Sequence, residues 1–578
     1  MTNWSPDHPA VNETSASRKP LQVVPFLALL FVLLTVPLPA LARQGEPPLS
    51  STSQDLTSVA SVPVTALPAV EVTTLLAKDA KRTTPGPLTF AVPVPVQISP
   101  TSHGQWEDLP DGGKVWRLRF ESPGATDLNF GFTRFRLPPG AKLYIISEAE
   151  GYFEGPYTAE DNEPHFQLWT PVVPGGKAVV ELFLPAGVSP QTVELELTQV
   201  ATGYLDLFGR SELSLIKQGS CNIDVICPQG EPWRNEIRST AAIAFGGFLF
   251  CTGTLLADEP GTFRNFVLTA DHCGIGPLNA LSVVVYWNFE SPVCGQLDGG
   301  SLADNQIGAS YRAGRSDVDI TLIELSTTPS PSFNVYYSGW DRSNNPLSPP
   351  LGSVGIHHPS GDEKAISFNL DPLVTVNNCI GTGGDSTDTH WEMDWEQGTT
   401  EPGSSGSGIW SPDSQGLVGF LSGGSASCFF PNGTDCYGKF AVAWDGLTPD
   451  IRLKDWLDPN GLDPVTVHGS DAPGALTLAS PEPGVAGQVN DFTSTFATPG
   501  ATVYYVYGTR TGSTAIPGCS GVVDIRNAKV FGNAMADPTG TAQLSRTVPS
   551  GAQGLNLLLQ AVEPGSCSVS NRLSFVFQ

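Results

Sequence analysis

Five residues, Gly403-Ser404-Ser405-Gly406-Ser407, could form the tight turn that a serine nucleophile requires. Glycine tolerates backbone angles that other residues avoid, so a serine between glycines can expose its hydroxyl and aim neighbouring N–H groups at one point. An acyl-transfer nucleophile with an oxyanion hole needs this arrangement. Glycine and serine runs also form plain loops, so the catalytic interpretation requires a base and a carboxylate elsewhere in the chain.

The candidate base is His272, which follows the apolar run Phe266–Ala270 and precedes Cys273. A disulfide at Cys273 would pin the backbone at the histidine, and a general base gains from being held in place. Cys251, on a neighbouring predicted strand, is the candidate partner. The alternative is a histidine that merely lies beside a structural disulfide.

Two aspartates, Asp317 and Asp319, could supply the carboxylate that orients the base. Strand alternation places both on one face, so periodicity does not separate them. Asp319 begins the apolar strand and is expected to be the more buried. A buried carboxylate can fix the imidazole tautomer and stabilise the imidazolium. Asp317 is expected to be a solvated residue at the strand entry.

The elements that must position these residues are predicted to be strands. Among 578 residues, 61 Gly and 51 Pro separate short runs rich in Val, Thr, Tyr and Phe, which indicates a mostly β protein of three or four domains. The net charge of −27 argues against nucleic acid or an anionic membrane surface as a partner. No HExxH motif or Cys/His cluster indicates a metal, and no cofactor is expected.

Residues 1–42 are typical of a secretory signal peptide. Arg18-Lys19 precede an apolar stretch, and Ala40-Leu41-Ala42 forms a cleavage site that ends at Ala42. An uncleaved membrane anchor is the alternative. We expect a secreted, extracellular protein with no stable membrane insertion after signal removal. In that oxidising environment ten cysteines predict five disulfides.

The rest of the chain divides into segments that differ in composition and in hydrophobic alternation. Residues 43–217 are predicted to be a propeptide, with a disordered leader to about residue 100 and a β-sandwich at about 101–205. Residues 218–466, which contain eight cysteines, form the predicted catalytic domain, which the resemblance given below implies is a trypsin-like serine protease domain. Residues 467–484 are predicted to be a linker and residues 485–578 a C-terminal β-sandwich accessory domain.

The order His272, Asp319, Ser405 is similar to that of the chymotrypsin-type proteases. In addition, several motifs resemble those of bacterial lysyl endopeptidases of the Achromobacter protease I type. The resemblance covers about 218–460, and its motifs are Gly219-Ser220-Cys221-Asn222-Ile223-Asp224, Val283-Val284-Val285-Tyr286-Trp287-Asn288, Ser338-Gly339-Trp340-Asp341-Arg342, Ile356-His357-His358-Pro359 and Thr400–Ser407.

The resemblance implies a chymotrypsin-like double β-barrel and a secreted serine endopeptidase. His272 would be the base, Asp319 the triad aspartate and Ser405 the nucleophile. The backbone N–H groups of Gly403 and Ser405 would form the oxyanion hole.

The family's disulfide pairing maps onto this chain. It implies three bonds, and two more follow by elimination; together they are Cys221–Cys428, Cys227–Cys294, Cys251–Cys273, Cys379–Cys436 and Cys519–Cys567.

Lysine specificity requires a negative charge at the base of the substrate pocket, because a buried ammonium is costly without a partner. The family's pocket aspartate precedes a Tyr-Gly-basic triplet, which implies Asp435 here, and Ser422-Gly423-Gly424 would form the wall that pairs with substrate. The family's stacked histidine and tryptophan are not matched, since Ser422 stands at the histidine position.

The predicted substrates are proteins or peptides with lysine at the cleaved bond, and a monomer is expected. The sequence up to Lys217 has seven Lys and eight Arg, and the rest has four Lys and eleven Arg, which favours lysine mildly. The chain is expected to be a zymogen that releases itself by cutting after Lys217. The alternatives are Arg or mixed specificity, or a non-catalytic surface-binding protein with a protease-like core.

Overall fold

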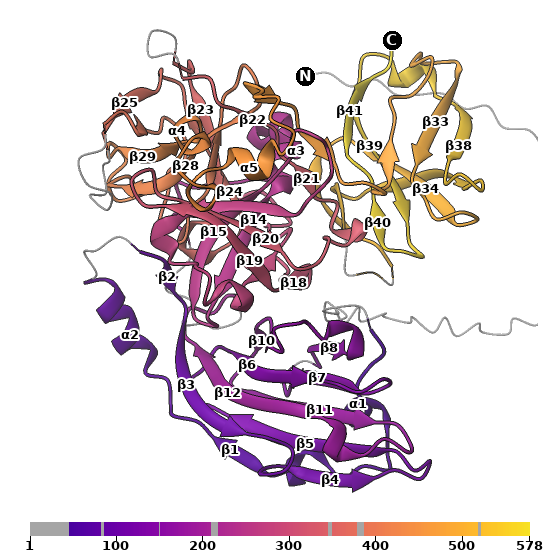
Figure 1. Ribbon diagram of the computed structural model, residues 1–578. Helices are drawn as coiled ribbons and strands as arrows, with labels where there is room; N and C mark the ends of the chain where they lie inside the picture. The colour runs from indigo at the N-terminus through magenta and orange to yellow at the C-terminus, as the bar shows by residue number, and fades with distance from the viewer. Residues whose placement is uncertain are drawn as a thin grey trace, which may run out of the picture. The chain divides into compact units, whose positions relative to one another are not determined.

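The computed structural model describes residues 45–81, 86–149, 151–209, 218–344, 349–377, 387–517, 519 and 522–578 (Figure 1). The predicted signal peptide with Ala42, and also Lys217 and Cys379, lie outside the described residues. Within these ranges, no helix is long and apolar enough to cross a membrane. The prediction of a mostly β protein is confirmed.

The N-terminal domain is a sandwich of two sheets. The first sheet consists of β1 (Val64–Ala66), β4 (Gln105–Asp108), β5 (Lys114–Glu121), β7 (Lys142–Ser147), β8 (Phe153–Tyr157) and β11 (Lys177–Leu184). The second consists of β3 (Ala91–Ile98), β6 (Asp127–Arg136), β9 (Leu168–Trp169), β10 (Val173–Pro174) and β12 (Glu194–Gly203). Apolar side chains from both sheets, such as Phe120 and Phe130, form one buried core.

The expectation of a disordered leader to about residue 100 is wrong. Strand β1 pairs with β5, and β3 pairs with β12. Pro93 and Pro95 concealed β3 from sequence reasoning, because proline cannot donate to a ladder. Strand β3 is at the end of its sheet, where proline is tolerated.

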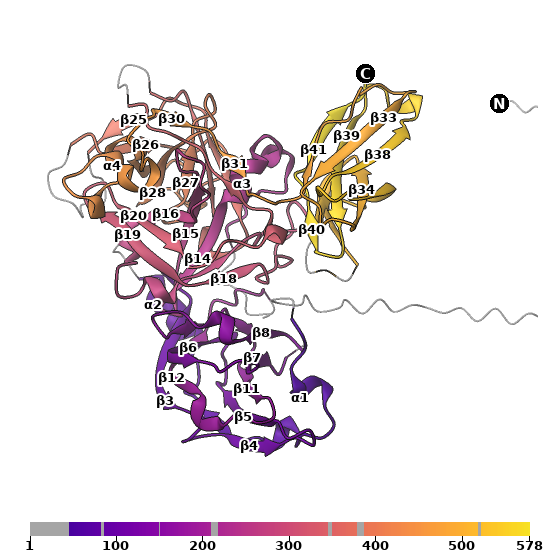
Figure 2. The ribbon, with the colours of Figure 1, turned by 45° about the vertical axis from the view of Figure 1, so that its right-hand side comes forward.

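The central domain has two sheets that are mostly antiparallel, in agreement with the two-barrel architecture that the resemblance implies. The first contains β14 (Thr240–Phe245), β15 (Leu249–Leu256), β16 (Phe266–Ala270), β17 (Val284–Tyr286), β18 (Asn305–Ile307), β19 (Ala309–Arg315) and β20 (Ile320–Leu325), with β2 (Leu88–Thr89) on β15. Figure 2 shows β14, β15, β16, β20 and β19 running side by side.

The second sheet of the central domain carries the serine motif. It contains β13 (Ile223–Asp224), β22 (Trp340–Asp341), β23 (Ser353–His357), β24 (Ala365–Asn369), β25 (Val374–Val376), β26 (His390–Met393), β27 (Gly408–Trp410), β28 (Leu417–Gly424), β29 (Asp435–Lys439) and β30 (Thr466–Val467). Short helices complete the chain: α1 (Leu49–Thr52), α2 (Val72–Asp79), α3 (Arg234–Ser239), α4 (Phe440–Trp444) and α5 (Lys454–Leu457).

Each sheet of the central domain encloses apolar side chains, and a third cluster joins the two sheets. Ile243 and Val285 belong to the cluster of the first sheet, and Ile409 and Tyr437 to that of the second. The shared cluster includes Phe266 of β16 and residues of β23, β27 and β28. Burial of this apolar surface is the main favourable contribution that holds the two sheets together.

The predicted linker at 467–484 is also wrong in large part. Strand β30 pairs with β22, and β31 (Ser470–Asp471) pairs with β21 (Tyr336–Tyr337). Strand β32 (Thr477–Leu478) pairs with β33 (Val489–Thr495) of the last domain. The Gly, Pro and Ser content of the segment indicated a loop, but these short pairings bind it to both neighbours.

The C-terminal domain is a second sandwich (Figure 1). Its strands are β33 (Val489–Thr495), β34 (Thr502–Gly508), β35 (Thr511–Ala515), β36 (Val522–Ile525), β37 (Lys529–Met535), β38 (Ala542–Thr547), β39 (Asn556–Glu563), β40 (Ser568–Val569) and β41 (Leu573–Val576). Phe492 and Tyr505, from different sheets, share its core.

The structure contains four of the expected disulfides, namely Cys221–Cys428, Cys227–Cys294, Cys251–Cys273 and Cys519–Cys567. The Cys251–Cys273 bond ties β15 to the turn that carries His272. For Cys379–Cys436, Cys379 lies outside the described residues.

Thr252 of β15 holds the serine loop against the first sheet. Its N–H donates to the Ser405 carbonyl at 2.8 Å, and its hydroxyl donates to the Gly403 carbonyl at 2.9 Å. The same hydroxyl oxygen accepts from the His358 N–H at 3.2 Å. One side chain therefore satisfies two buried backbone groups of the second sheet's loops.

Thr252→Val is expected to lower the free energy of unfolding by about 1–3 kcal/mol, because it leaves a buried N–H and a buried C=O without partners. Chemical denaturation in a Ser405→Ala background measures this. Thr321→Val is the matched control: Thr321 is buried, and its hydroxyl has no hydrogen-bond partner among the described residues. Equal losses in the two variants would contradict the assignment of the cost to these hydrogen bonds.

Candidate active site

His272 and Asp319 are joined by two hydrogen bonds. The His272 Nδ1 lies 2.8 Å from Asp319 Oδ2, and the His272 backbone N–H donates to Asp319 Oδ1 at 2.8 Å. Asp319 is 1% exposed. A buried carboxylate favours the proton on Nδ1, which leaves Nε2 as the ring atom able to accept another proton.

The backbone separates the two candidate aspartates that the sequence could not. Asp319 has a φ of +61°, and β20 begins only at Ile320. Regular alternation therefore does not extend back to Asp317, whose carboxylate pairs with Arg315 at 2.8 Å. Asp319 instead turns inward to His272, and Asp317 forms a surface ion pair.

The serine loop needs glycine at two positions. Gly403 has a φ of +101°, and a Cβ there would lie 2.7 Å from the Gly361 nitrogen. Gly406 has a φ of +81°, and a Cβ there would lie 2.2 Å from Thr269 Oγ1 on β16. The loop thus packs directly on the strand that ends two residues before His272.

Ser405 differs from its two neighbours in exposure. Ser404 and Ser407 are fully buried, whereas Ser405 is partly exposed. The Ser404 hydroxyl lies 2.8 Å from His357 Nδ1 and accepts from the Glu401 N–H at 3.3 Å. Burial lowers the pKa of His357 to about 3, so this histidine is neutral. Of the three hydroxyls, that of Ser405 is the one open to a substrate.

Asp435 is a buried carboxylate with an incomplete set of partners. Its Oδ2 accepts hydrogen bonds from Trp395 Nε1 at 2.7 Å and Thr400 Oγ1 at 2.6 Å. Its Oδ1 is buried and makes no hydrogen bond of regular geometry among the described residues, although the Ala426 backbone N–H lies near the carboxylate. Burial raises the pKa of Asp435 to about 6, although the bonds from Thr400 and Trp395 and the nearby Ala426 N–H oppose that shift.

Gly424 lies directly over this carboxylate. A Cβ at Gly424 would lie 2.3 Å from Asp435 Oδ1, so any side chain at position 424 would clash with that oxygen. Gly423 and Gly424 end β28, which pairs with β29 through Gly424 and Asp435. The sequence-predicted wall and the predicted pocket base are therefore adjacent.

Sequence reasoning missed three residues near these positions. His390 Nε2 lies 3.2 Å from the Ser422 hydroxyl, so an imidazole reaches position 422 from β26. Trp395 and Thr400 bind Asp435, as described above. Thr400 adjoins the serine motif and could have been flagged for that reason. Nothing in the sequence signals the other two, because strand pairing alone brings β26 next to β29.

Two of the four lysines after Gln218 are buried. The Lys364 ammonium pairs with Glu290 at 2.9 Å and donates to the Ile237 carbonyl at 2.8 Å. Lys439 lies 3.9 Å above the Trp391 ring, and burial lowers its pKa to about 8. Lys454 is partly exposed and Lys529 is exposed.

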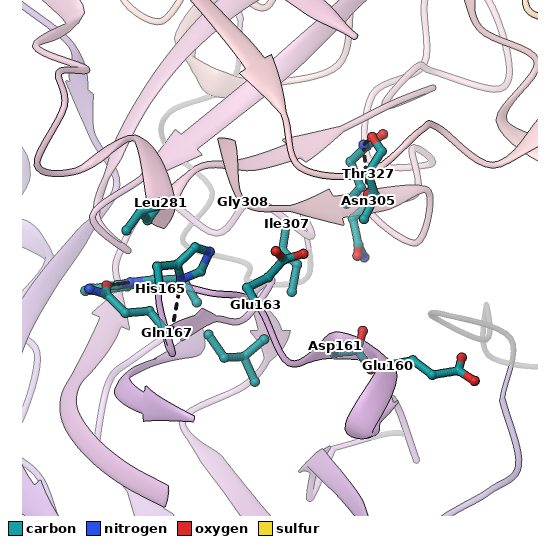
Figure 3. Close-up of a pocket in the computed structure, with 13 residues that line it drawn as sticks. Glu160, Asp161, Glu163, His165, Gln167, Leu281, Asn305, Ile307, Gly308 and Thr327 are labelled. Carbon is teal, nitrogen blue, oxygen red and sulfur yellow. Dashed lines mark hydrogen bonds between the residues drawn. The ribbon is translucent and has the colours of Figure 1, made fainter. Parts of the chain in front are cut away.

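A separate polar pocket of about 80 Å³ lies away from these residues (Figure 3). It is lined by Glu163 and His165 of the N-terminal domain and by Asn305 of β18. His165 Nδ1 accepts from the Gln167 N–H at 3.1 Å, and burial lowers the pKa of this histidine. None of the residues predicted to do chemistry lines this pocket.

Comparisons with known proteins match two parts of the chain. Residues 64–202 match the profile described as lysyl endopeptidase N-terminal domain, and residues 215–438 match lysyl endopeptidase, C-terminal domain. A lysyl endopeptidase of Pseudomonas aeruginosa is 29% identical over 377 residues, which cover 60% of this chain and 76% of that protein.

Solved structures give partial likenesses. The secreted serine protease VesC from Vibrio cholerae has a TM-score of 0.26 and 16% identity, over 59% of this chain and 69% of its own. Mouse neuropsin, a serine protease, has a TM-score of 0.23 and 20% identity, over 36% of this chain and 92% of its own.

The two profile matches together span both the N-terminal sandwich and most of the two-sheet domain that holds His272, Asp319 and Ser405. The match also reaches back to residue 64, into the segment that sequence reasoning treated as a leader. The chain therefore belongs to the lysyl endopeptidase family of serine endopeptidases.

Proposed function

We propose that this protein is a secreted endopeptidase that hydrolyses peptide bonds on the carboxyl side of lysine. The observation that carries the proposal is Asp435, a buried carboxylate with one oxygen that makes no hydrogen bond of regular geometry among the described residues and lies against a glycine. An unpaired buried charge costs several kcal/mol. A lysine ammonium placed against Oδ1 would remove that cost, which a neutral side chain would not.

The proposed chemistry divides the reaction among four groups. Ser405 Oγ attacks the scissile carbonyl and gives its proton to His272 Nε2, while Asp319 stabilises the imidazolium through Nδ1. The backbone N–H groups of Gly403 and Ser405 stabilise the oxyanion, and losing one such donor typically costs about 10²–10³ in rate. His272 then protonates the leaving amine, and water hydrolyses the acyl-enzyme.

The disulfides support an extracellular location, since such bonds persist in oxidising environments. Cleavage after arginine is the alternative within the same class, because the same carboxylate could accept a guanidinium. Cleavage of peptides that differ only in having Lys or Arg at the scissile position separates the two.

Peptides that differ only at one residue, Lys, Arg or Glu, are expected to be cut at Lys by the mature protein. Asp435→Asn is expected to lower kcat/KM for the Lys peptide by about 10²–10³, the equivalent of losing one partner of a buried ion pair. Asp394→Asn, at an exposed aspartate, is the matched control.

Covalent labelling by an organophosphonate should be lost in Ser405→Ala and blocked in His272→Ala. Substantial Glu cleavage, or an undiminished rate in Asp435→Asn, would contradict the role of Asp435.

Binding of n-butylammonium, a mimic of the lysine side chain, should depend on pH through Asp435. Its pKa of about 6 means that the free carboxyl is ionised above pH 6 and neutral below it. The amine stays charged up to a pH of about 10. We therefore expect constant affinity from pH 7 to 9 and a roughly tenfold loss per unit below pH 6.

Calorimetry on Ser405→Ala measures this affinity without turnover. Asp435→Asn should bind weakly at every pH. Equal affinity of Ser405→Ala for n-butylammonium at pH 5 and pH 8 would count against Asp435 as the ligand for the ammonium.

Self-cleavage after Lys217 is proposed to release the mature protein, and the residues that follow are already docked. The Gln218 N–H donates to Asp362 Oδ2 at 3.0 Å, and the Gly219 N–H donates to Glu401 Oε2 at 2.9 Å. After cleavage, the Gln218 nitrogen would become an ammonium beside the Asp362 carboxylate. Position 404 is a serine, whose hydroxyl contacts His357 and Glu401, so it offers no carboxylate for the new amine.

Mass spectrometry of the secreted protein should find a mature N-terminus at Gln218, as glutamine or as its cyclised pyroglutamyl form. Ser405→Ala should remain unprocessed when expressed alone, because the cut is self-made. A start far from residue 218 would rule the processing site out.

A further inference from the structure

A two-residue strand of the N-terminal region, β2, extends the first sheet of the central domain, which under the proposed function is the catalytic domain. It runs antiparallel to β15, with Leu88 opposite Phe250 and Thr89 opposite Leu249. The Phe90 N–H continues the ladder by donating to the Phe248 carbonyl at 3.0 Å. A segment on the propeptide side of Lys217 is therefore held by main-chain pairing, in the way that a bound peptide adds a strand to a sheet edge.

The paired edge leads directly to the nucleophile loop. Two residues after Phe250, Thr252 binds the carbonyls of Ser405 and Gly403. The Leu88 side chain also reaches this loop. A Cβ at Gly403 would lie 3.3 Å from Leu88 Cδ2, and one at Gly361 would lie 2.8 Å from the same atom. Leu88 thus packs against Gly403, the residue whose backbone N–H is proposed to bind the oxyanion.

The position of β2 relative to the lysine pocket identifies which half of a substrate it replaces. The acyl half, which ends in the lysine, belongs at Asp435 and Gly424, where β28 meets β29. The leaving half must continue past Ser405, away from the lysine pocket. On that side the main chain of β15 lies next to Ser405, because the Thr252 N–H donates to the Ser405 carbonyl. The hydrogen bonds to Asp435 come from Trp395 and Thr400, which belong to the catalytic domain.

We propose that Leu88 and Thr89 occupy the site for the leaving half of the substrate, so that the propeptide inhibits the enzyme from that side and leaves the lysine pocket open. The proposal rests on the proposed function. The occupant has no lysine at the scissile position, since Gly86 and Pro87 precede Leu88. The strand therefore blocks the groove without presenting a bond that the enzyme would cut.

Strand β2 is bonded to the N-terminal domain, so it can leave β15 only when that domain leaves with it. The Tyr204 hydroxyl donates to the Thr89 carbonyl at 2.7 Å, and the Tyr204 N–H donates to the Phe90 carbonyl at 2.9 Å. Phe90 is fully buried in an apolar cluster that includes Phe250 and Tyr286 of the catalytic domain. This anchoring lowers the entropy cost of presenting β2 and strengthens inhibition.

The test compares two substrates on the full-length chain with Lys217→Gln, which keeps the junction intact. The first is a phosphonofluoridate with a lysine side chain, whose leaving group is a single fluoride. The second is an internally quenched peptide with three residues beyond its lysine. Against the mature enzyme, we expect labelling within about threefold but peptide cleavage at least about 100-fold slower, because only the peptide needs the β15 edge.

Leu88→Asp in the same chain should speed peptide cleavage by at least about tenfold, since it removes apolar burial and places a charge against the loop. Leu88→Ala should act in the same direction with a smaller effect, which guards against misfolding of the Asp variant. Val64→Asp is the matched control, because Val64 is 46% exposed in the same domain.

Two results would overturn the inference while leaving the proposed function intact. One is equal suppression of labelling and peptide cleavage, which would mean that the propeptide covers the lysine pocket or Ser405 itself. The other is peptide cleavage by Leu88→Asp no faster than by Val64→Asp. Absence of labelling in the mature enzyme would instead reject the proposed function, and the inference with it.

Discussion

The proposed active site depends on holding a loop of one sheet against a strand of the other. His272 and Asp319 belong to the first sheet, whereas Ser405 belongs to a loop that leads into the second. Thr252 bridges them through two hydrogen bonds to the serine loop, and Thr269 Oγ1 donates to the Thr252 carbonyl at 2.8 Å. Catalytic geometry tolerates little error. The buried hydrogen bonds of Thr252 fix the position of the serine loop relative to β15 more closely than apolar packing alone would.

The sequence predicts catalytic roles most readily for residues that lie in continuous motifs. His272 and Ser405 stand beside a cysteine and between glycines, and both patterns have a local physical cause. It could not choose between Asp317 and Asp319 from periodicity, because the choice depends on a positive φ at Asp319 that no pattern encodes. It also missed His390, which reaches Ser422 only through the pairing of distant strands. Contacts of that kind are set by the tertiary fold rather than by local sequence.

The errors in the flanking regions share one origin. Proline and glycine content predicts disorder or a linker in these segments, yet β3 is an edge strand and β30 pairs with β22. At a sheet edge a residue without an N–H donor costs little. Short strands of two residues, such as β2, lie below what alternation can detect, and here one of them pairs beside the proposed active site.

The burial of Lys364 and Lys439 bears on how long the enzyme survives its own activity. Under the proposed specificity, each lysine of the mature chain is a bond at which one molecule could destroy another. With those two side chains enclosed by Glu290 and Trp391, only the bonds after Lys454 and Lys529 carry a lysine open to solvent. The second lies in the C-terminal sandwich, so damage there would spare the catalytic domain. Working life at high enzyme concentration would then be governed by the bond after Lys454.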